Sequence, residues 1–327
     1  MLENITALGI SSGGLDSILA AFVMQSAGIN VKWITFETPF FSSEKSVKAS
    51  KLYNISLRVE NITIDYTKML KAPAGGYGKN MNPCLDCHSL MFRKAGELME
   101  EEGASFLFSG EVLGQRPMSQ TRNSLRYVEK QSGYEGLIVR PLSGRLLPET
   151  IPEANGWVKR DSFADISGRS RKRQFLLAKE FGIKDFPSAG GGCLLTEKVF
   201  SGRLNDLFEH QESIETVDYE LLKYGRHLRI SPFEKLVIGR DESENNAMER
   251  LAENLECIKI RIFDYPGPFA VLRGSGENMF TAGAICAGYT RAPVNSPCRV
   301  SFEKHGMELV KEIYPIEKSD IKDMFIK

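Results

Sequence analysis

Residues 7–22, ALGISSGGLDSILAAF, contain the turn that decides the fold. An apolar run typical of a buried strand leads into Ser-Ser-Gly-Gly, and an Asp, a Ser and a second apolar stretch follow as the start of a helix. Glycines let the backbone approach an anion with successive N–H groups, and the helix N-terminus adds its positive dipole end. The order strand, glycine-rich turn, helix therefore predicts a phosphate-binding loop.

The polar side chains of this loop narrow its type. The hydroxyls of Ser12 and Ser17 suit phosphate oxygens, whereas Asp16 would repel phosphate and so either holds Mg²⁺ or organises the loop. The loop lacks the GK[ST] ending of a Walker loop, and the chain has no GxGxxG fingerprint. The alternative to a ligand site is a glycine-rich turn with a serine N-cap.

Residues 12–17, SGGLDS, resemble the SGGxDS signature of the PP-loop ATP pyrophosphatases. Enzymes of that family split ATP to AMP and pyrophosphate and adenylate a carbonyl oxygen of a second substrate. The resemblance implies ATP and Mg²⁺ as cofactors, Asp16 as the magnesium ligand and a catalytic residue, and the AMP base near residues 33–36. The implied nucleotide-binding residues are Ser11, Ser12, Gly13, Gly14, Leu15, Asp16, Ser17, Phe36, Ser109 and Gly110.

Strand-like and helix-like segments alternate over the first 155 residues. The expected strands are 5–10, 31–36, 57–64, 105–108 and 136–139, and the expected helices are 17–27, 42–53 and 88–102. Such alternation predicts parallel strands joined by crossovers, that is, a doubly wound, mainly parallel α/β sheet. Ligands bind such sheets at the carboxyl ends of the strands.

The composition then changes along the chain. Residues 141–160 contain three prolines and two glycines, and a basic helix is expected at 170–181. Beyond about residue 205, short strand-like and helical pieces suggest a smaller α+β domain. We predict a PP-loop ATP pyrophosphatase domain at 1–155, a basic linker or helical segment at 156–204 carrying the third site cysteine, and the α+β domain at 205–327.

Composition and charge limit the partners. The chain lacks an apolar run long enough for a membrane span and begins without a basic secretory segment, so we expect a cytoplasmic enzyme with no membrane partner. Formal charge is +4 over residues 1–200 and −4 over 201–327, which excludes a uniformly basic coat for nucleic acid. RNA contact would need a local patch, for which the candidates are Arg116, Arg122, Arg169, Arg171, Lys172 and Arg173. Solvated loops and a solvated helix face are the competing interpretation.

Three cysteines carry a second resemblance. NPCLDCHSLMFRKA (82–95) and GGGCLLTE (190–197) are similar to cysteine segments of the tRNA 2-thiouridine synthetases (MnmA/TrmU-like), although His88 stands where Asn is usual. Over residues 5–205 the chain also resembles thiouridylase-like PP-loop proteins, through SGEVLGQRPMSQ (109–120), RPLSGRLLPETIPE (140–153) and ISGRSRKRQ (166–174). The resemblance implies sulfur transfer to RNA, with tRNA as the expected substrate and sulfide or a persulfide carrier as donor.

Replacing a uridine carbonyl oxygen by sulfur requires an activated oxygen and a sulfur source. Cys84, Cys87 and Cys193 would ligate three irons of a [4Fe–4S] cluster and leave the fourth iron open. A persulfide relay through Cys87 and Cys193 is the alternative, and a zinc site with His88 as fourth ligand, or plain burial, is a third. The remaining cysteines, Cys257, Cys286 and Cys298, are expected to be buried.

YGRHLRISPFEKLVIGRDESEN (224–245) resembles the NFACT-R (DUF814-like) module, which occurs in RNA-binding proteins of ribosome quality control. Candidate contact residues there are Arg226, His227, Arg229, Arg240 and Arg273. Together these features predict an ATP-dependent RNA thiolase with catalytic Cys84, Cys87, Cys193 and Asp16. The alternatives are a PP-loop ligase or amidase with structural cysteines, a non-enzymatic RNA-binding factor, and an enzyme that removes sulfur.

Overall fold

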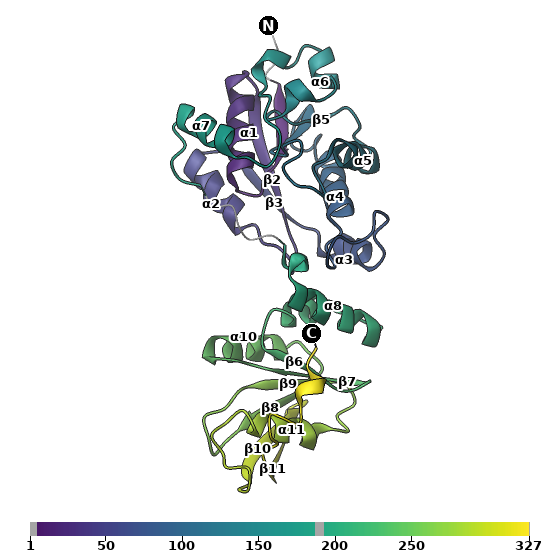
Figure 1. The fold of residues 1–327 in the computed structure, drawn as a ribbon, viewed down its shortest axis with the longest axis vertical. Coiled ribbons are helices and arrows are strands. Elements are labelled where there is room, and N and C mark those ends of the chain that lie inside the picture. The colour runs from purple at the N-terminus through teal and green to yellow at the C-terminus, as the bar shows by residue number, and fades with distance from the viewer. Residues whose placement is uncertain (1–4, 187–192, 327) are drawn as a thin grey trace. The chain divides into compact units, whose positions relative to one another are not determined.

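A computed structural model describes residues 5–186 and 193–326, and contacts divide the chain into two compact units, Met1–Cys193 and Leu194–Lys327. Figure 1 shows the elements of both. In the first unit the strands are β1 (Thr6–Ile10), β2 (Asn30–Glu37), β3 (Leu57–Asn61), β4 (Phe106–Ser109) and β5 (Ile138–Val139). The helices are α1 (Leu15–Ser26), α2 (Glu44–Tyr53), α3 (Thr63–Lys71), α4 (Cys84–Glu97), α5 (Arg122–Ser132), α6 (Ile151–Ala154) and α7 (Lys172–Glu180).

The five strands form one parallel sheet in the order β3-β2-β1-β4-β5. Helices α1, α2 and α7 lie on one side of this sheet and α3, α4 and α5 on the other (Figure 1). The predicted doubly wound α/β class is therefore confirmed. Because the strand order reverses between β1 and β4, the ligand crevice of this topology lies beyond the carboxyl ends of those two strands.

Burial explains why β1 and β4 pair at the centre of the sheet. Ala7 and Leu8 on β1 and Phe106 and Leu107 on β4 are fully buried, as expected for parallel strands covered on both faces. A Cβ at Gly9 would lie 2.2 Å from the ring of Phe108, so the neighbouring strand occupies the space that any side chain would need.

The predicted bounds of two elements, one strand and one helix, were wrong. The strand expected at 57–64 ends at Asn61, because the Asn61 side chain accepts a hydrogen bond from the Thr63 N–H (3.0 Å) and α3 starts there. The helix expected at 88–102 instead spans Cys84–Glu97, so its predicted start and end were both wrong and both Cys84 and Cys87 lie in its first turn.

The second unit is an antiparallel sheet with helices on it. Its strands are β6 (Arg226–Ser231), β7 (Glu234–Ile238), β8 (Ile258–Ile262), β9 (Ala270–Arg273), β10 (Cys298–Lys304) and β11 (Met307–Ile313), in the order β11-β10-β8-β9-β7-β6. Its helices are α8 (Lys198–His210), α9 (Thr216–Leu221), α10 (Glu242–Ala252) and α11 (Met279–Ala287). Separate apolar clusters form beneath α11 and beneath α9 and α10, which confirms the predicted α+β domain.

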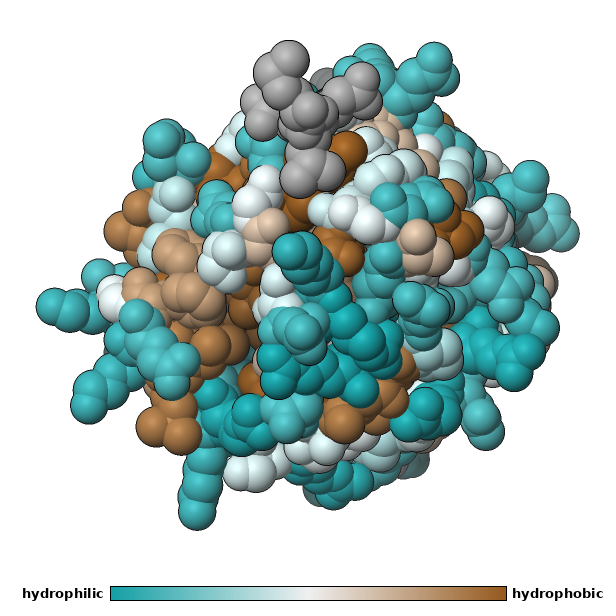
Figure 2. Space-filling model, turned by 90° about the horizontal axis from the view of Figure 1, so that it is seen from above, coloured by the Kyte–Doolittle hydropathy of each residue, from teal (hydrophilic) through white to brown (hydrophobic). Residues whose placement is uncertain are grey.

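In Figure 2 the face of the molecule seen from above is mostly hydrophilic, with hydrophobic side chains gathered toward its left side. None of the helices within residues 5–186 and 193–326 is both long enough and apolar enough to cross a membrane.

Candidate functional site

The predicted phosphate loop occupies the turn between β1 and α1. The Gly13 N–H donates to the Ser11 hydroxyl oxygen at 3.1 Å, which holds the turn closed. Gly13 has a φ of 66°, and a Cβ there would lie 2.2 Å from the carbonyl carbon of Lys45, so only glycine fits. Ser12 is exposed, and no side chain caps the first turn of α1. The backbone N–H groups of this uncapped first turn and the Ser12 hydroxyl are therefore available to an anion.

Other predicted nucleotide residues surround the loop. A Cβ at Gly110 would lie 2.4 Å from the carbonyl carbon of Asp16, so the turn after β4 lies directly against the first turn of α1. Ser109, the last residue of β4, is buried. Phe36 is buried near the end of β2. The Ser17 hydroxyl donates to the Gly14 carbonyl oxygen at 2.8 Å and so serves the helix backbone in this structure.

Asp16 is held by residues from distant parts of the first unit. Its Oδ2 accepts a hydrogen bond from Gln115 Nε2 at 2.8 Å, and its Oδ1 lies 3.5 Å from a guanidinium nitrogen of Arg171. Oδ1 is also buried without a hydrogen-bond partner. A carboxylate oxygen with an unused lone pair at a phosphate loop fits a hard cation such as Mg²⁺.

The three predicted sulfur residues interact with one another. Cys84 and Cys87 lie in the first turn of α4, and Asn82 Nδ2 donates to Sγ of Cys84 at 3.1 Å. Burial raises the pKa of the Cys87 thiol, and the neighbouring charges of Cys193 and Cys84 raise it further. A hydrogen bond from the buried Tyr66 opposes this rise.

The three predicted sulfur residues do not form a site for a single metal ion within the described residues. Within the described ranges, no group of three or more His, Cys, Asp or Glu side chains is spaced to hold one metal ion, and none of the six cysteines forms a disulfide. Cysteines that ligate a [4Fe–4S] cluster bind different irons, so their sulfurs need not converge on one point.

His88, which follows Cys87, belongs to a buried ionic network that the sequence did not reveal. His88 Nδ1 lies 2.8 Å from Glu111 Oε1, and Arg140 Nε donates to Glu111 Oε2 at 2.9 Å; Arg140 also pairs with Glu129. Burial alone would raise the pKa of the Glu111 carboxyl, but the charge of Arg140 and the contact with His88 outweigh it and lower it to about 2. The network links the first turn of α4 to the end of β4.

Five of the six predicted RNA-binding residues face solvent. Arg116, Arg122, Arg169, Lys172 and Arg173 are exposed. Two of these have partners within the unit, since Arg122 donates to the Leu146 carbonyl oxygen (3.0 Å) and Arg173 pairs with Asp165 (2.5 Å). The sixth, Arg171, is partly buried beside Asp16.

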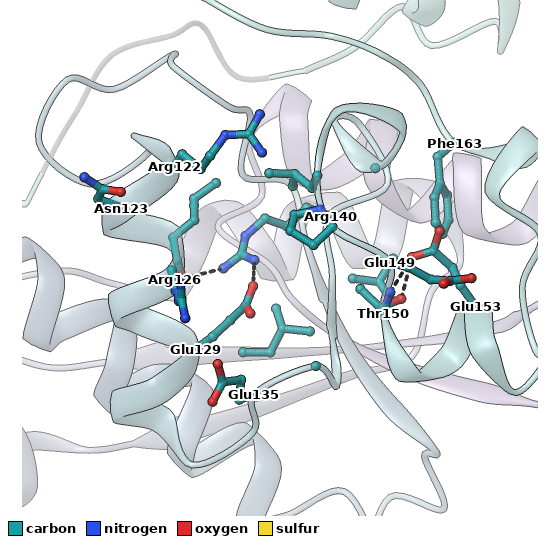
Figure 3. Close-up of a pocket in the computed structure, with 17 residues that line it drawn as sticks. Arg122, Asn123, Arg126, Glu129, Glu135, Arg140, Glu149, Thr150, Glu153 and Phe163 are labelled. Atoms are coloured by element: carbon teal, nitrogen blue, oxygen red, sulfur yellow. Dashed lines mark hydrogen bonds and ion pairs between the residues drawn. The ribbon is translucent and has the colours of Figure 1, made fainter.

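A cavity of about 370 Å³ opens between α5, β5 and the segment 144–153 (Figure 3). Figure 3 shows Arg122 and Arg126 on one side of it, Glu149 and Glu153 on the other, and the Arg140–Glu129 pair between them. Neither the phosphate loop nor the three cysteines line this cavity, whereas Arg122, a predicted RNA-binding residue, does.

In the second unit most of the candidate contact residues are engaged internally. Arg229 makes two hydrogen bonds to Asp206, Arg240 pairs with Glu244 and Arg273 with Asp218, while Arg226 stacks over the Tyr289 ring. His227 is buried, and burial lowers the pKa of its imidazole well below the ordinary value. Each of these five side chains therefore has a partner within the domain or is buried.

Two family models match the chain. Residues 4–153 match thiamine biosynthesis protein (ThiI), and residues 225–326 match the NFACT protein RNA binding domain. The two matched ranges lie one in each compact unit. The resemblance to PP-loop thiouridine synthetases and to the NFACT-R module is thereby confirmed.

Several solved structures are similar to the chain. A predicted tRNA methyltransferase subunit from Methanocaldococcus jannaschii is 14% identical over 54% of this chain and 76% of that one, with a TM-score of 0.35. A 4-thiouridine synthetase, in complex with RNA and bound ATP, is 22% identical over 54% of this chain and 51% of that one (TM-score 0.34). The C-terminal part of a fibronectin/fibrinogen-binding protein from Streptococcus suis is 13% identical over 74% and 94% (TM-score 0.27).

Proposed function

From a ThiI-family domain at residues 4–153 and an NFACT-type RNA-binding domain at 225–326, we propose that this chain is an ATP-dependent RNA sulfur transferase. Its substrate would be a uridine in RNA, most simply tRNA, whose carbonyl oxygen is activated with ATP and replaced by sulfur. Sulfide or a persulfide carrier would supply the sulfur.

One observation carries the proposal: the phosphate loop and the cysteine group share the carboxyl edge of the same sheet. Gly110 lies against Asp16 of the phosphate loop, and the next residue, Glu111, contacts His88, which follows Cys87. Two consecutive residues, Gly110 and Glu111, thus connect the proposed ATP site with the cysteine group. An enzyme that activates an oxygen and then delivers sulfur to the same carbon needs this proximity.

The loop residues have defined tasks in the first half of the reaction. The uncapped N–H groups of α1 and the Ser12 hydroxyl would bind the polyphosphate, and Asp16 would hold Mg²⁺ through Oδ1. Mg²⁺ neutralises phosphate charge. The uridine oxygen attacks the α-phosphorus, the bond to pyrophosphate breaks, and the oxygen is left as an ester of AMP.

The cysteines would serve the second half. Sulfur forms a bond to the activated carbon, the carbon–oxygen bond breaks, and AMP leaves. Cys84, Cys87 and Cys193 are the residues that would hold a cluster, which when bound supplies an iron with an open position. In the alternative, a persulfide carrier would transfer its outer sulfur to Cys87; as that sulfur passes to the activated carbon, its bond to Cys87 breaks and Cys193 forms a disulfide with Cys87.

A nucleotide assay tests the first half. The full chain, tRNA and α-labelled ATP should yield AMP and pyrophosphate rather than ADP, and Asp16→Asn should abolish the yield. Asp161→Asn, which changes an exposed carboxylate of the same unit, is the matched control and should leave it intact. ATP cleavage that survives Asp16→Asn would contradict the proposal.

Metal analysis separates the two sulfur mechanisms. After anaerobic purification we expect about four irons and four acid-labile sulfides per chain, lost on Cys193→Ser but retained on Cys286→Ala, a buried cysteine of α11. No iron after anaerobic reconstitution would exclude the cluster mechanism and leave the persulfide relay.

A further inference from the structure

Asp16, Gln115, Gln174 and Arg171 form one connected polar group beside the phosphate loop. Gln174 Nε2 donates to Gln115 Oε1 at 2.7 Å, and Gln115 Nε2 donates in turn to Asp16 Oδ2 at 2.8 Å. The guanidinium of Arg171 closes the group 3.5 Å from Asp16 Oδ1. Arg171 and Gln174 therefore connect the start of α7 to the first turn of α1.

This group contains unsatisfied polar atoms. Asp16 Oδ1, Arg171 Nε and Gln174 Oε1 are all buried without a hydrogen-bond partner, and Gln174 is fully buried. A buried polar atom without a partner costs about 1–3 kcal/mol, so three in one group call for an explanation. A bound group with both negative and positive charge, such as a polyphosphate with its cation, would satisfy the guanidinium and the carboxylate together.

The basic side chains at the start of α7 point in two different directions. Arg171 and Gln174, three residues apart, point toward the phosphate loop, whereas the side chains of Lys172 and Arg173 are exposed. The Arg171 guanidinium also lies 5.6 Å from the centre of the Phe175 ring, which holds it in place between that ring and Asp16. The side chain of Arg171 thus points toward the phosphate loop, unlike those of Lys172 and Arg173.

We propose that Arg171 binds the polyphosphate of the nucleoside triphosphate, and that Gln174 and Gln115 position it. The inference rests on the proposed function and assigns Arg171 to the nucleotide site rather than to an RNA-binding surface. A guanidinium offers several N–H donors in a fork that matches phosphate oxygens, and its charge offsets the repulsion between Asp16 and phosphate.

Binding measurements on the full chain test this assignment. The probes are α,β-methylene-ATP, which resists cleavage, and AMP, each with Mg²⁺, together with labelled tRNA. We expect Arg171→Ala to raise the Kd for α,β-methylene-ATP by about tenfold or more, to change the Kd for AMP by less than about threefold, and to leave tRNA affinity unchanged. Arg171→Lys, which keeps the charge and the fold, should fall between wild type and Arg171→Ala.

Two exposed neighbours provide matched controls. Lys172→Ala and Arg173→Ala remove a positive charge from the same helix, and each should leave nucleotide affinity within about twofold of wild type. Equal nucleotide affinity of wild type and Arg171→Ala, an equal loss for AMP, or a loss of tRNA affinity alone would each overturn the assignment. If wild type itself bound no nucleotide, the proposed function would fail first, so the two failures are distinguishable.

Discussion

His88 Nδ1 lies 2.8 Å from Oε1 of Glu111, and through this contact the helix turn that carries Cys84 and Cys87 is tied to the strand end that meets the phosphate loop. Glu111 follows β4 by two residues, and the pairing of Arg140 with its other oxygen holds the carboxylate in a fixed orientation. The distance between the phosphate loop and the helix turn with the cysteines therefore depends on one buried carboxylate, that of Glu111.

Replacing that carboxylate should destabilise the protein. In Glu111→Gln the buried Arg140 loses one of its two charged partners and keeps Glu129, and breaking a buried pair costs about 3–5 kcal/mol. Chemical unfolding of the full chain measures this loss for the first unit. Glu101→Gln, which affects an exposed pair with Arg58, should change the free energy of unfolding by less than about 1 kcal/mol. Equal stability of the two variants would contradict this account of the network.

The same carboxylate predicts an acid-dependent stability. The folded state lowers the pKa of Glu111 from an ordinary 4.5 to about 2, so its contribution is complete above about pH 4.5 and is lost as the pH falls toward 2. The contribution is on the order of 3 kcal/mol. Unfolding free energies between pH 6 and 3 should fall more steeply for wild type than for Glu111→Gln, and parallel curves would contradict the prediction.

Gly13→Ala should abolish nucleotide binding and lower the free energy of unfolding only modestly. The added Cβ would both adopt an unfavourable φ of 66° and collide with the Lys45 backbone at 2.2 Å, so the loop must open. Gly28→Ala is the control, because Gly28 has a similar φ of 84° but no atom within 4 Å of an added Cβ. Titration with α,β-methylene-ATP should separate the two, and a wild-type Kd in Gly13→Ala would refute the loop assignment.

Tyr66→Phe should slow alkylation of Cys87. The phenol donates a hydrogen bond that favours the Cys87 thiolate, while its ring packs beside Phe40 and Phe41 and would remain in place in the variant. Tyr77→Phe is the control, since its hydroxyl donates instead to the Leu70 carbonyl oxygen at 2.6 Å. Iodoacetamide labelling of the iron-free protein, followed by peptide mass spectrometry, gives the rates. An unchanged rate for Tyr66→Phe would show that the hydrogen bond has no effect on the sulfur.

The parallel sheet and the phosphate loop could be predicted because their signals are local. Buried strands such as β1 are continuous apolar runs, and the loop is one short motif. In contrast, α5 escaped prediction because only Leu125, Val128 and Ser132 are buried on an otherwise polar helix. The strand β11 escaped because it is exposed along almost its whole length as an edge strand and shows no alternation.

The site network depends on non-local pairing that no sequence pattern encodes. Glu111 and Arg140 are 29 residues apart, and each is buried with the other as a charged partner. The direction of Arg171 likewise depends on how α7 packs against α1, while Lys172 has the same charge and points outward. That Cys84, Cys87 and Cys193 act together stays a prediction from the sequence, and in the structure the charges of Cys193 and Cys84 act on Cys87.

The most direct test of the central claim is mass spectrometry of nucleosides from tRNA incubated anaerobically with the full chain, ATP, Mg²⁺ and ³⁴S-labelled sulfide. The account predicts a uridine in which one oxygen is replaced by ³⁴S, formed only with ATP and lost in Asp16→Asn and Cys193→Ser. Formation of AMP and pyrophosphate with no labelled thionucleoside, from reconstituted protein and a full set of tRNAs supplied in turn with labelled sulfide and with a labelled persulfide donor, would contradict it.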